Sequence, residues 1–175
     1  MNRKALTILA IALIAAASAG AQITLSTSYM ADINAARSSV VRGSGIFTSL
    51  VTVGADMSVC ALHGGIEAFY AFGTSWGFNG TIDFNFVRYS PPKSGFNLTL
   101  GGGIEPWMEV LPRNVINFSV LLHLPFDVSW QPLSQLPFQL FLKLSPFLGI
   151  SLVSGTPMVY GLDANLGLRW VIVSN

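Results

Sequence analysis

The feature of this sequence that most restricts its fold is an alternation of apolar and polar residues with a period of two. It is clearest over residues 77–89, where Phe78 and Ile82 alternate with Asn79 and Asp83. Successive side chains of a strand point to opposite faces of a sheet, so this pattern indicates a strand with one apolar and one polar face. After the first 21 residues, no stretch is long and apolar enough to predict a membrane helix.

The same alternation recurs along the chain and predicts eight strands. They cover residues 23–33, 46–58, 66–73, 77–89, 96–110, 116–129, 138–151 and 160–172. Short segments rich in Gly, Pro, Ser and Asn separate them, and the longest connection is 35–45. An even number of strands with short connections predicts an all-β fold, a closed up-and-down antiparallel barrel.

Two kinds of barrel share this pattern: a soluble one with its apolar face inward, as in lipocalins, and a transmembrane one with its apolar face outward. Only 10% of the residues are charged, against about a quarter in ordinary soluble domains. The many Phe and Leu side chains of the apolar face are too bulky for the interior of eight strands. The sequence therefore favours the transmembrane barrel, and solubility without detergent would favour the other.

Aromatic residues near the strand ends are typical of the girdle that transmembrane barrels place at the membrane interface. Those expected to form it are Tyr29, Trp76, Tyr89, Trp107, Trp130, Tyr160 and Trp170. Trp107 supports the girdle only in part, because by parity it alternates with the outward residues and counts as inward.

Three prolines fall inside the expected strands: Pro106, Pro125 and Pro146. A proline cannot donate a hydrogen bond to a strand ladder. We therefore expect β-bulges at these positions, or places beyond the hydrocarbon. A bulge would reverse the facing of every residue beyond it.

The first 21 residues have the features of a secretory signal peptide. Arg3 and Lys4 precede an apolar run over 5–16, and small residues follow at possible cleavage sites. We expect a cleaved signal peptide at 1–21 and a barrel at 22–175. The alternative, an uncleaved membrane helix, would need about 20 apolar residues. The one cysteine, Cys60, cannot form an internal disulfide and is expected to be a small buried hydrophobe.

The last strand carries a pattern that resembles the signal read by the barrel-insertion machinery. Over 165–172 it runs polar-x-Gly-x-x-hydrophobic-x-hydrophobic, with Gly167, Trp170 and Ile172 as its fixed positions. With the strand count and the signal peptide, the chain resembles the small eight-stranded outer-membrane barrels of the OmpX, OmpA transmembrane-domain and OmpW types. It departs from them at its end, because they usually finish on Phe or Trp and this chain runs on to Asn175.

The resemblance implies where the protein lies and what it meets. It implies an integral protein of the bacterial outer membrane, in contact with outer-membrane lipids and recognised by the insertion machinery. A monomer is expected. Nucleic acid is not expected as a partner, because the chain has no basic run.

All eight acidic residues fall on the polar track that would line the lumen. They are Asp32, Asp56, Glu67, Asp83, Glu105, Glu109, Asp127 and Asp163. Lys143 and Arg169 are the bases on this track, and His123 can titrate. Charge that faces lipid is costly, so a transmembrane barrel requires this confinement.

The acidic residues are expected to gather near one end of the barrel. With both termini in the periplasm, counting from the turns near 73, 111 and 154 puts six acids in the outer half. This acidic belt consists of Asp32, Glu67, Asp83, Glu105, Glu109 and Asp163, while Lys143 and Arg169 lie deeper.

Within this belt, a hairpin centred near Ser75 would place Glu67 opposite Asp83, with Cβ atoms ~5 Å apart. Two carboxylates so close need a cation, a basic partner or a shared proton. We expect Arg37 and Arg42, in the long first connection, to fold into the mouth and neutralise the belt. The alternative is an unplugged acidic mouth that favours cations.

The sequence predicts no catalytic, cofactor or metal site. Glu105 and Glu109 lie four residues apart, as do His123 and Asp127, and this spacing on one strand is ~13 Å. That is too far for a glycosidase pair or a direct dyad. Neither His63 nor His123 stands in the His-x-Ser pattern of lipid A deacylases.

Three classes of function remain. The first is a structural or surface-interaction barrel with a packed interior, and the second is a narrow channel for cations or small solutes. The least favoured is a lipid-modifying enzyme. A wide pore is excluded, because the side chains of eight strands nearly fill the interior.

Overall fold

The structure, a computed structural model, describes residues 22–33, 48–71, 75–133, 136–152 and 158–173. The signal peptide expected at 1–21 lies outside these residues. The strands are β1 (Gln22–Ile33), β2 (Thr48–Val59), β3 (Leu62–Ala71), β4 (Ser75–Tyr89), β5 (Phe96–Leu111), β6 (Val115–His123), β7 (Phe126–Trp130), β8 (Phe138–Ser151) and β9 (Met158–Val173), with a short 3-10 turn η1 (Pro112–Asn114). Within the described part of the chain, no helix is long and apolar enough to cross a membrane.

Segments β6 and β7 are two parts of one strand. Against β5, Gly103 pairs with His123 and Leu100 pairs with Phe126, so the register is unchanged across the gap. The pairing with β8 is equally continuous. Backbone hydrogen bonds bridge the gap, because Gly101 donates to the carbonyl of Pro125. The nine labelled segments therefore form eight strands, with β6 and β7 counted as one.

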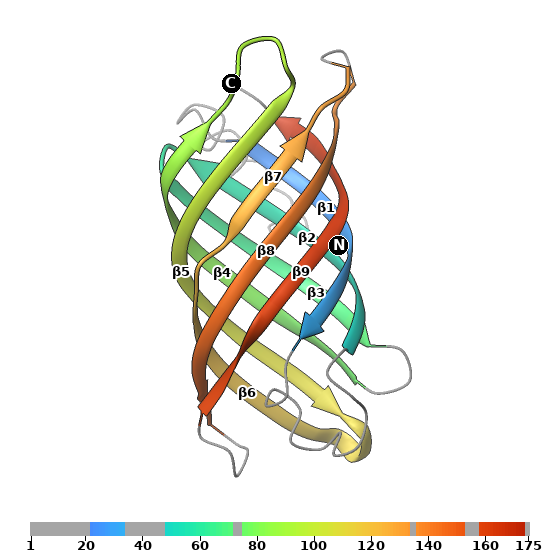
Figure 1. The fold of residues 1–175 in the computed structure, drawn as a ribbon. Coiled ribbons are helices and arrows are strands. Elements are labelled where there is room, and N and C mark those ends of the chain that lie inside the picture. Colours follow the sequence, from blue (N-terminus) through green and yellow to red (C-terminus); the bar gives the residue numbers. More distant parts are fainter. Residues whose placement is uncertain (1–21, 34–47, 72–74, 134–135, 153–157, 174–175) are drawn as a thin grey trace, which may run out of the picture.

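These eight strands close into an antiparallel barrel (Figure 1). Each strand pairs with its neighbours in the sequence, and β1 closes the cylinder by pairing with β9 from Ile23↔Val173 to Ile33↔Leu162. The predicted all-β fold, with eight antiparallel strands in up-and-down order, is confirmed. We call the end where β1 begins and β9 finishes the terminal end, and the opposite end the loop end. In Figure 1 the terminal end is at the top.

The faces of the strands divide as the alternation predicts. Ile82, Leu122 and Leu166 on the outer face are each more than 60% exposed. Inward residues such as Ser119, Asp83 and Asp163 are at most 2% exposed. The outer face is thus apolar on every strand, and most of the inner face is polar.

The β-bulges expected at the prolines are absent, so that alternative is wrong. Pro106 pairs with Val120 and Pro146 with Leu162 without a change in register, and the facing continues unchanged past Pro125. A proline removes one donor from the ladder, but the amides on either side of it keep their bonds and hold the register. One strong irregularity lies elsewhere, where Asn85 pairs with Gly101 and Val87 with Leu100. This bulge leaves Phe86 and Val87 both on the outside.

Two further expectations about single residues are corrected. Cys60 is exposed rather than buried, because it lies in the tight turn between β2 and β3 and has a φ of 54°. Trp107 is not part of an interfacial girdle. It is 2% exposed and lies inside the barrel, as its parity indicates, whereas the other six aromatic residues are exposed on the outer face.

Candidate functional site

The interior of the barrel contains a cluster of apolar side chains and a polar chamber at different heights. Towards the loop end, seven strands contribute buried apolar side chains that pack together. This apolar layer consists of Met30, Leu50, Phe69, Ala71, Trp107, Leu121, Phe147 and Val159. Towards the terminal end, the interior is a polar chamber.

The apolar layer is tightly packed. The rings of Phe69 and Trp107 stack with centroids 4.2 Å apart and an interplanar angle of 24°. Gly77 on β4 makes room for this pair, since a Cβ atom there would lie 2.5 Å from the Phe69 ring. Gly149 does the same for Leu121, at 2.7 Å. The layer is therefore a closely packed group of apolar side chains from strands that are not all neighbours.

The polar chamber has a volume of about 110 Å³, well above the ~10–15 Å³ that one water requires. Its lining comes from the parts of the strands nearest the terminal end. The lining residues include Gln22, Asp56, Ser58, His63, Glu67, Asp83, Arg88, Asn97, Thr99, Asp127, Phe141, Lys143 and Arg169. The chamber thus holds four acidic and three basic side chains.

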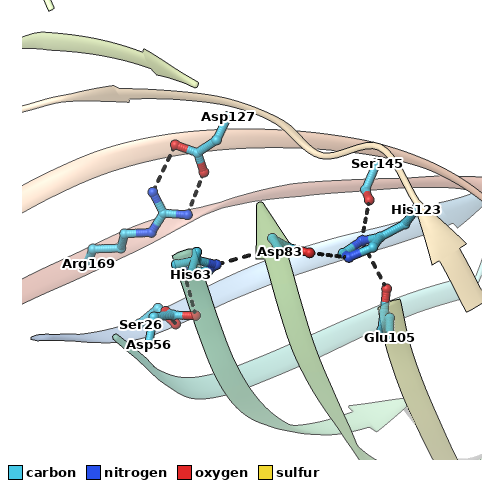
Figure 2. Close-up of polar contacts among 9 residues, drawn as sticks. All are labelled: Ser26, Asp56, His63, Asp83, Glu105, His123, Asp127, Ser145 and Arg169. Atoms are coloured by element: carbon cyan, nitrogen blue, oxygen red, sulfur yellow. Dashed lines mark hydrogen bonds and ion pairs between the residues drawn. The ribbon is translucent and has the colours of Figure 1, made fainter. Parts of the chain in front are cut away.

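Between the layer and the chamber lies a buried polar network around His123 (Figure 2). His123 Nε2 lies 2.5 Å from Asp83 Oδ1, and its Nδ1 lies 3.0 Å from Ser145 Oγ and 3.4 Å from Glu105. Asn79 donates to Glu105 at 3.0 Å. Asp83 also faces His63 on the chamber side, at 3.4 Å. The members come from five strands, β3, β4, β5, β6 and β8, so the network ties the inner walls together.

A second ion pair joins β7 to β9. Both guanidinium nitrogens of Arg169 donate to the carboxylate of Asp127, at 2.9 and 2.5 Å. The guanidinium also lies 4.0 Å from the ring centroid of Phe141. Bidentate pairing of this kind is strong and directional. Arg169 and Asp127 therefore neutralise each other within the chamber wall.

The residues of the predicted acidic belt lie in different settings. Glu109 lies at the loop end and accepts a hydrogen bond from Ser75, at 2.5 Å. Glu105 and Asp163 are buried within the wall, whereas Glu67 and Asp83 line the chamber on the other side. The side chain of Asp32 and the residues Arg37 and Arg42 lie outside the described part of the chain, so the plug formed by these arginines stays a prediction.

The predicted pairing of Glu67 with Asp83 is also wrong. The hairpin is centred on residue 73, so Glu67 pairs with Asn79 and Asp83 pairs with His63. Shifting a hairpin centre by two residues keeps every side chain on its face. The alternation therefore identified the inward residues correctly but could not determine which of them lie opposite each other.

The series Asp83–His123–Ser145 has the residue types of a nucleophilic triad. Ser145 and His123 are at most 3% exposed, and neither lines the chamber. The three side chains link β4, β6 and β8 inside the barrel. Among the described residues, no group of three or more His, Cys, Asp or Glu side chains could hold a metal ion.

The residues of the insertion signal lie on β9, the strand that closes the barrel. Trp170 and Ile172 are exposed on the outer face. Gly167 pairs with Ser28 of β1, and a Cβ atom at this position would lie 2.2 Å from the carbonyl oxygen of Thr27. The three residues thus combine an apolar outer face with a close approach to β1.

Sequence reasoning missed the apolar layer. Its signal was present, because Phe69, Trp107 and Phe147 stand at inward positions where the other residues are polar or small. Apolar residues that interrupt a polar track could have been grouped by their distance from the strand ends. Arg88 was missed as a lining residue because the bulge before it reverses its parity.

No protein-family model matches this chain, and no curated protein matches it in sequence. Among solved structures, it is similar to the crystal structure of Neisserial surface protein A, an eight-stranded outer-membrane barrel. The TM-score is 0.58 with 12% sequence identity, over 86% of this chain and 96% of that chain. A similarity at 12% sequence identity shows the fold alone. The predicted resemblance to the small eight-stranded outer-membrane barrels is therefore confirmed as a resemblance of fold.

The two histidines that share Asp83 allow a matched test of the buried network. Replacing His123 by Leu would leave the carboxylates of Asp83 and Glu105 buried without it, which we expect to lower the free energy of unfolding by about 3 kcal/mol. His63→Leu should cost less than about 1 kcal/mol, because His63 is partly exposed in the chamber. Urea titration of both variants in detergent micelles measures the difference. Equal losses would contradict the role given to His123.

Proposed function

We propose that the protein is an integral barrel of the bacterial outer membrane whose lumen is sealed, with a structural or surface-interaction role. The observation that carries this proposal is the apolar layer across the lumen. Eight strands already leave little free interior. A constriction lined by apolar side chains also excludes ions and water.

The outer face supports the membrane part of the proposal. Large apolar side chains are exposed on every strand, among them Val53, Ile66, Ile82, Leu122, Leu148 and Leu166. A soluble monomer rarely exposes apolar patches larger than a few hundred Å². In lipid the same surface is favourable, and the closed ladder leaves no unpaired strand edge.

The remaining features follow from the same proposal. The protein would be exported by the signal peptide at 1–21 and inserted through the signal in β9. It would act as a monomer among outer-membrane lipids and would have no enzymatic activity. The outward aromatic residues Trp76, Trp130 and Trp170 would lie at the membrane interfaces.

A cation channel with an acidic mouth is the weaker alternative. It requires a continuous polar path, and the apolar layer interrupts that path. It also requires free carboxylates at the mouth, whereas Glu109 is hydrogen-bonded to Ser75 and buried.

Two leucines of similar exposure test whether the barrel spans a membrane. Leu122 in β6 is 62% exposed, and Leu133 in the connection after β7 is 59% exposed. In lipid vesicles, Leu122→Arg should lower the free energy of unfolding by about 2–4 kcal/mol, because the arginine would face hydrocarbon. Leu133→Arg should change it by less than about 1 kcal/mol. Similar small effects for both variants would mean that the outer face meets water.

Conductance tests the seal. In planar bilayers the protein should give no steady ion current. Trp107→Ala removes the largest side chain of the apolar layer and should give measurable openings, because the layer then has a gap beside Phe69. Trp76→Ala is the matched control, since Trp76 lies on the outer face near the same end and should leave the protein silent. Steady current through the unaltered protein would overturn the proposal.

A heat-modifiable gel shift should accompany the conductance measurement. Removing a buried tryptophan costs about 3–5 kcal/mol, so a silent Trp107→Ala variant must first be shown to be folded. A folded variant that never conducts would assign the seal to some other part of the interior.

A further inference from the structure

The charges of the polar chamber are arranged on opposite walls. The order of strands around the barrel is β1, β2, β3, β4, β5, β6 with β7, β8 and β9. In a ring of eight, β3 is therefore diametrically opposite β8. Glu67 on β3 and Lys143 on β8 both line the chamber, so they face each other across it.

The two side chains are not in direct contact. Lys143 forms no hydrogen bond or ion pair within 4.0 Å with any described residue. The ammonium group and the carboxylate are therefore more than 4.0 Å apart, in side chains that both line the chamber.

The other charges of the chamber are mostly engaged. Asp127 is paired with Arg169. Asp83 is held between His63 and His123. Asp56 on β2 has weaker partners, with Ser26 at 3.4 Å and His63 at 3.6 Å. Arg88 lines the chamber from the end of β4, nearer the terminal end.

We propose that the chamber is a binding site for a small zwitterion, open towards the terminal end. The anionic group of the ligand is held by Lys143, and its cationic group is held by Glu67 with help from Asp56. A molecule that carries a carboxylate and an ammonium group a few bonds apart, such as an α-amino acid, has this chemistry.

Charge balance favours a zwitterion over a simple ion. Four acidic and three basic side chains line the chamber, so its net charge is close to zero. A simple anion would meet the carboxylates of β2, β3 and β4, and a simple cation would meet Lys143. A zwitterion satisfies both walls at once, and the apolar layer keeps it from passing through.

Calorimetric titration of the refolded protein in an uncharged detergent at neutral pH tests this proposal, with glycine, acetate and methylammonium as probes. Glycine should bind saturably, and acetate and methylammonium should each bind at least about tenfold more weakly, because each can satisfy one wall only. Equal binding of acetate and glycine would make this an anion site and overturn the proposal. Absence of saturable glycine binding would overturn it as well.

Variants assign the binding to the two walls. Lys143→Met and Glu67→Gln should each weaken glycine binding about tenfold or more. The charge-swapped double variant, Glu67→Lys with Lys143→Glu, should recover most of the binding, because glycine can bind in the reverse direction. Ser119→Ala, a buried site away from the chamber, is the control and should bind glycine unchanged. Failure of the swapped variant to bind, when a gel shift shows it to be folded, would contradict the pairing of these walls.

This inference is independent of the seal. A barrel that conducts could still bind glycine between Glu67 and Lys143, and a sealed barrel could fail to bind it. Calorimetry and conductance therefore test the two proposals separately.

Discussion

The rest of this structure depends on the pairing of β1 with β9. That pairing runs from Ile23↔Val173 to Ile33↔Leu162 and turns an eight-stranded sheet into a cylinder without edges. Once the backbone groups are paired around the ring, the outer face can be wholly apolar, because no unpaired backbone donor or acceptor remains at a strand edge. The close approach of Gly167 to Thr27 and Ser28 shows how tightly the closing strands are held.

Closure with eight strands also decides what the interior can be. The lumen is narrow enough for side chains of strands that are not neighbours to meet, and they do so in two ways. Towards the loop end, Phe69 stacks on Trp107 and excludes solvent. Towards the terminal end, Arg169 and Asp127 pair on the wall, and Lys143 faces Glu67 across a chamber. His123 joins the two regions, because it bonds to Asp83 on the chamber side and to Ser145 in the wall.

The sequence predicted the strands and their facing well, because alternation depends only on the geometry of a single strand. It predicted the inward position of Glu105 and Lys143 for the same reason. It failed where the outcome depends on two strands at once. The partner of Glu67 is determined by the position of the hairpin centre, which the alternation of apolar and polar residues does not reveal. The bulge lies at Phe86, whereas bulges were expected at the prolines. The apolar layer was missed because it is assembled from one or two residues on each of seven strands, and only their positions together reveal it.

The central claim is that the lumen is open at the terminal end and closed at the loop end. The most direct measurement uses a single cysteine in the chamber, Ser58→Cys, in a protein whose exposed Cys60 has been changed to Ser. A charged, membrane-impermeant thiol reagent is then added to either side of vesicles in which the barrel is inserted in one direction. We expect rapid labelling from the side of the terminal end and none from the side of the loop end. Equal labelling from both sides would mean that the apolar layer does not close the barrel.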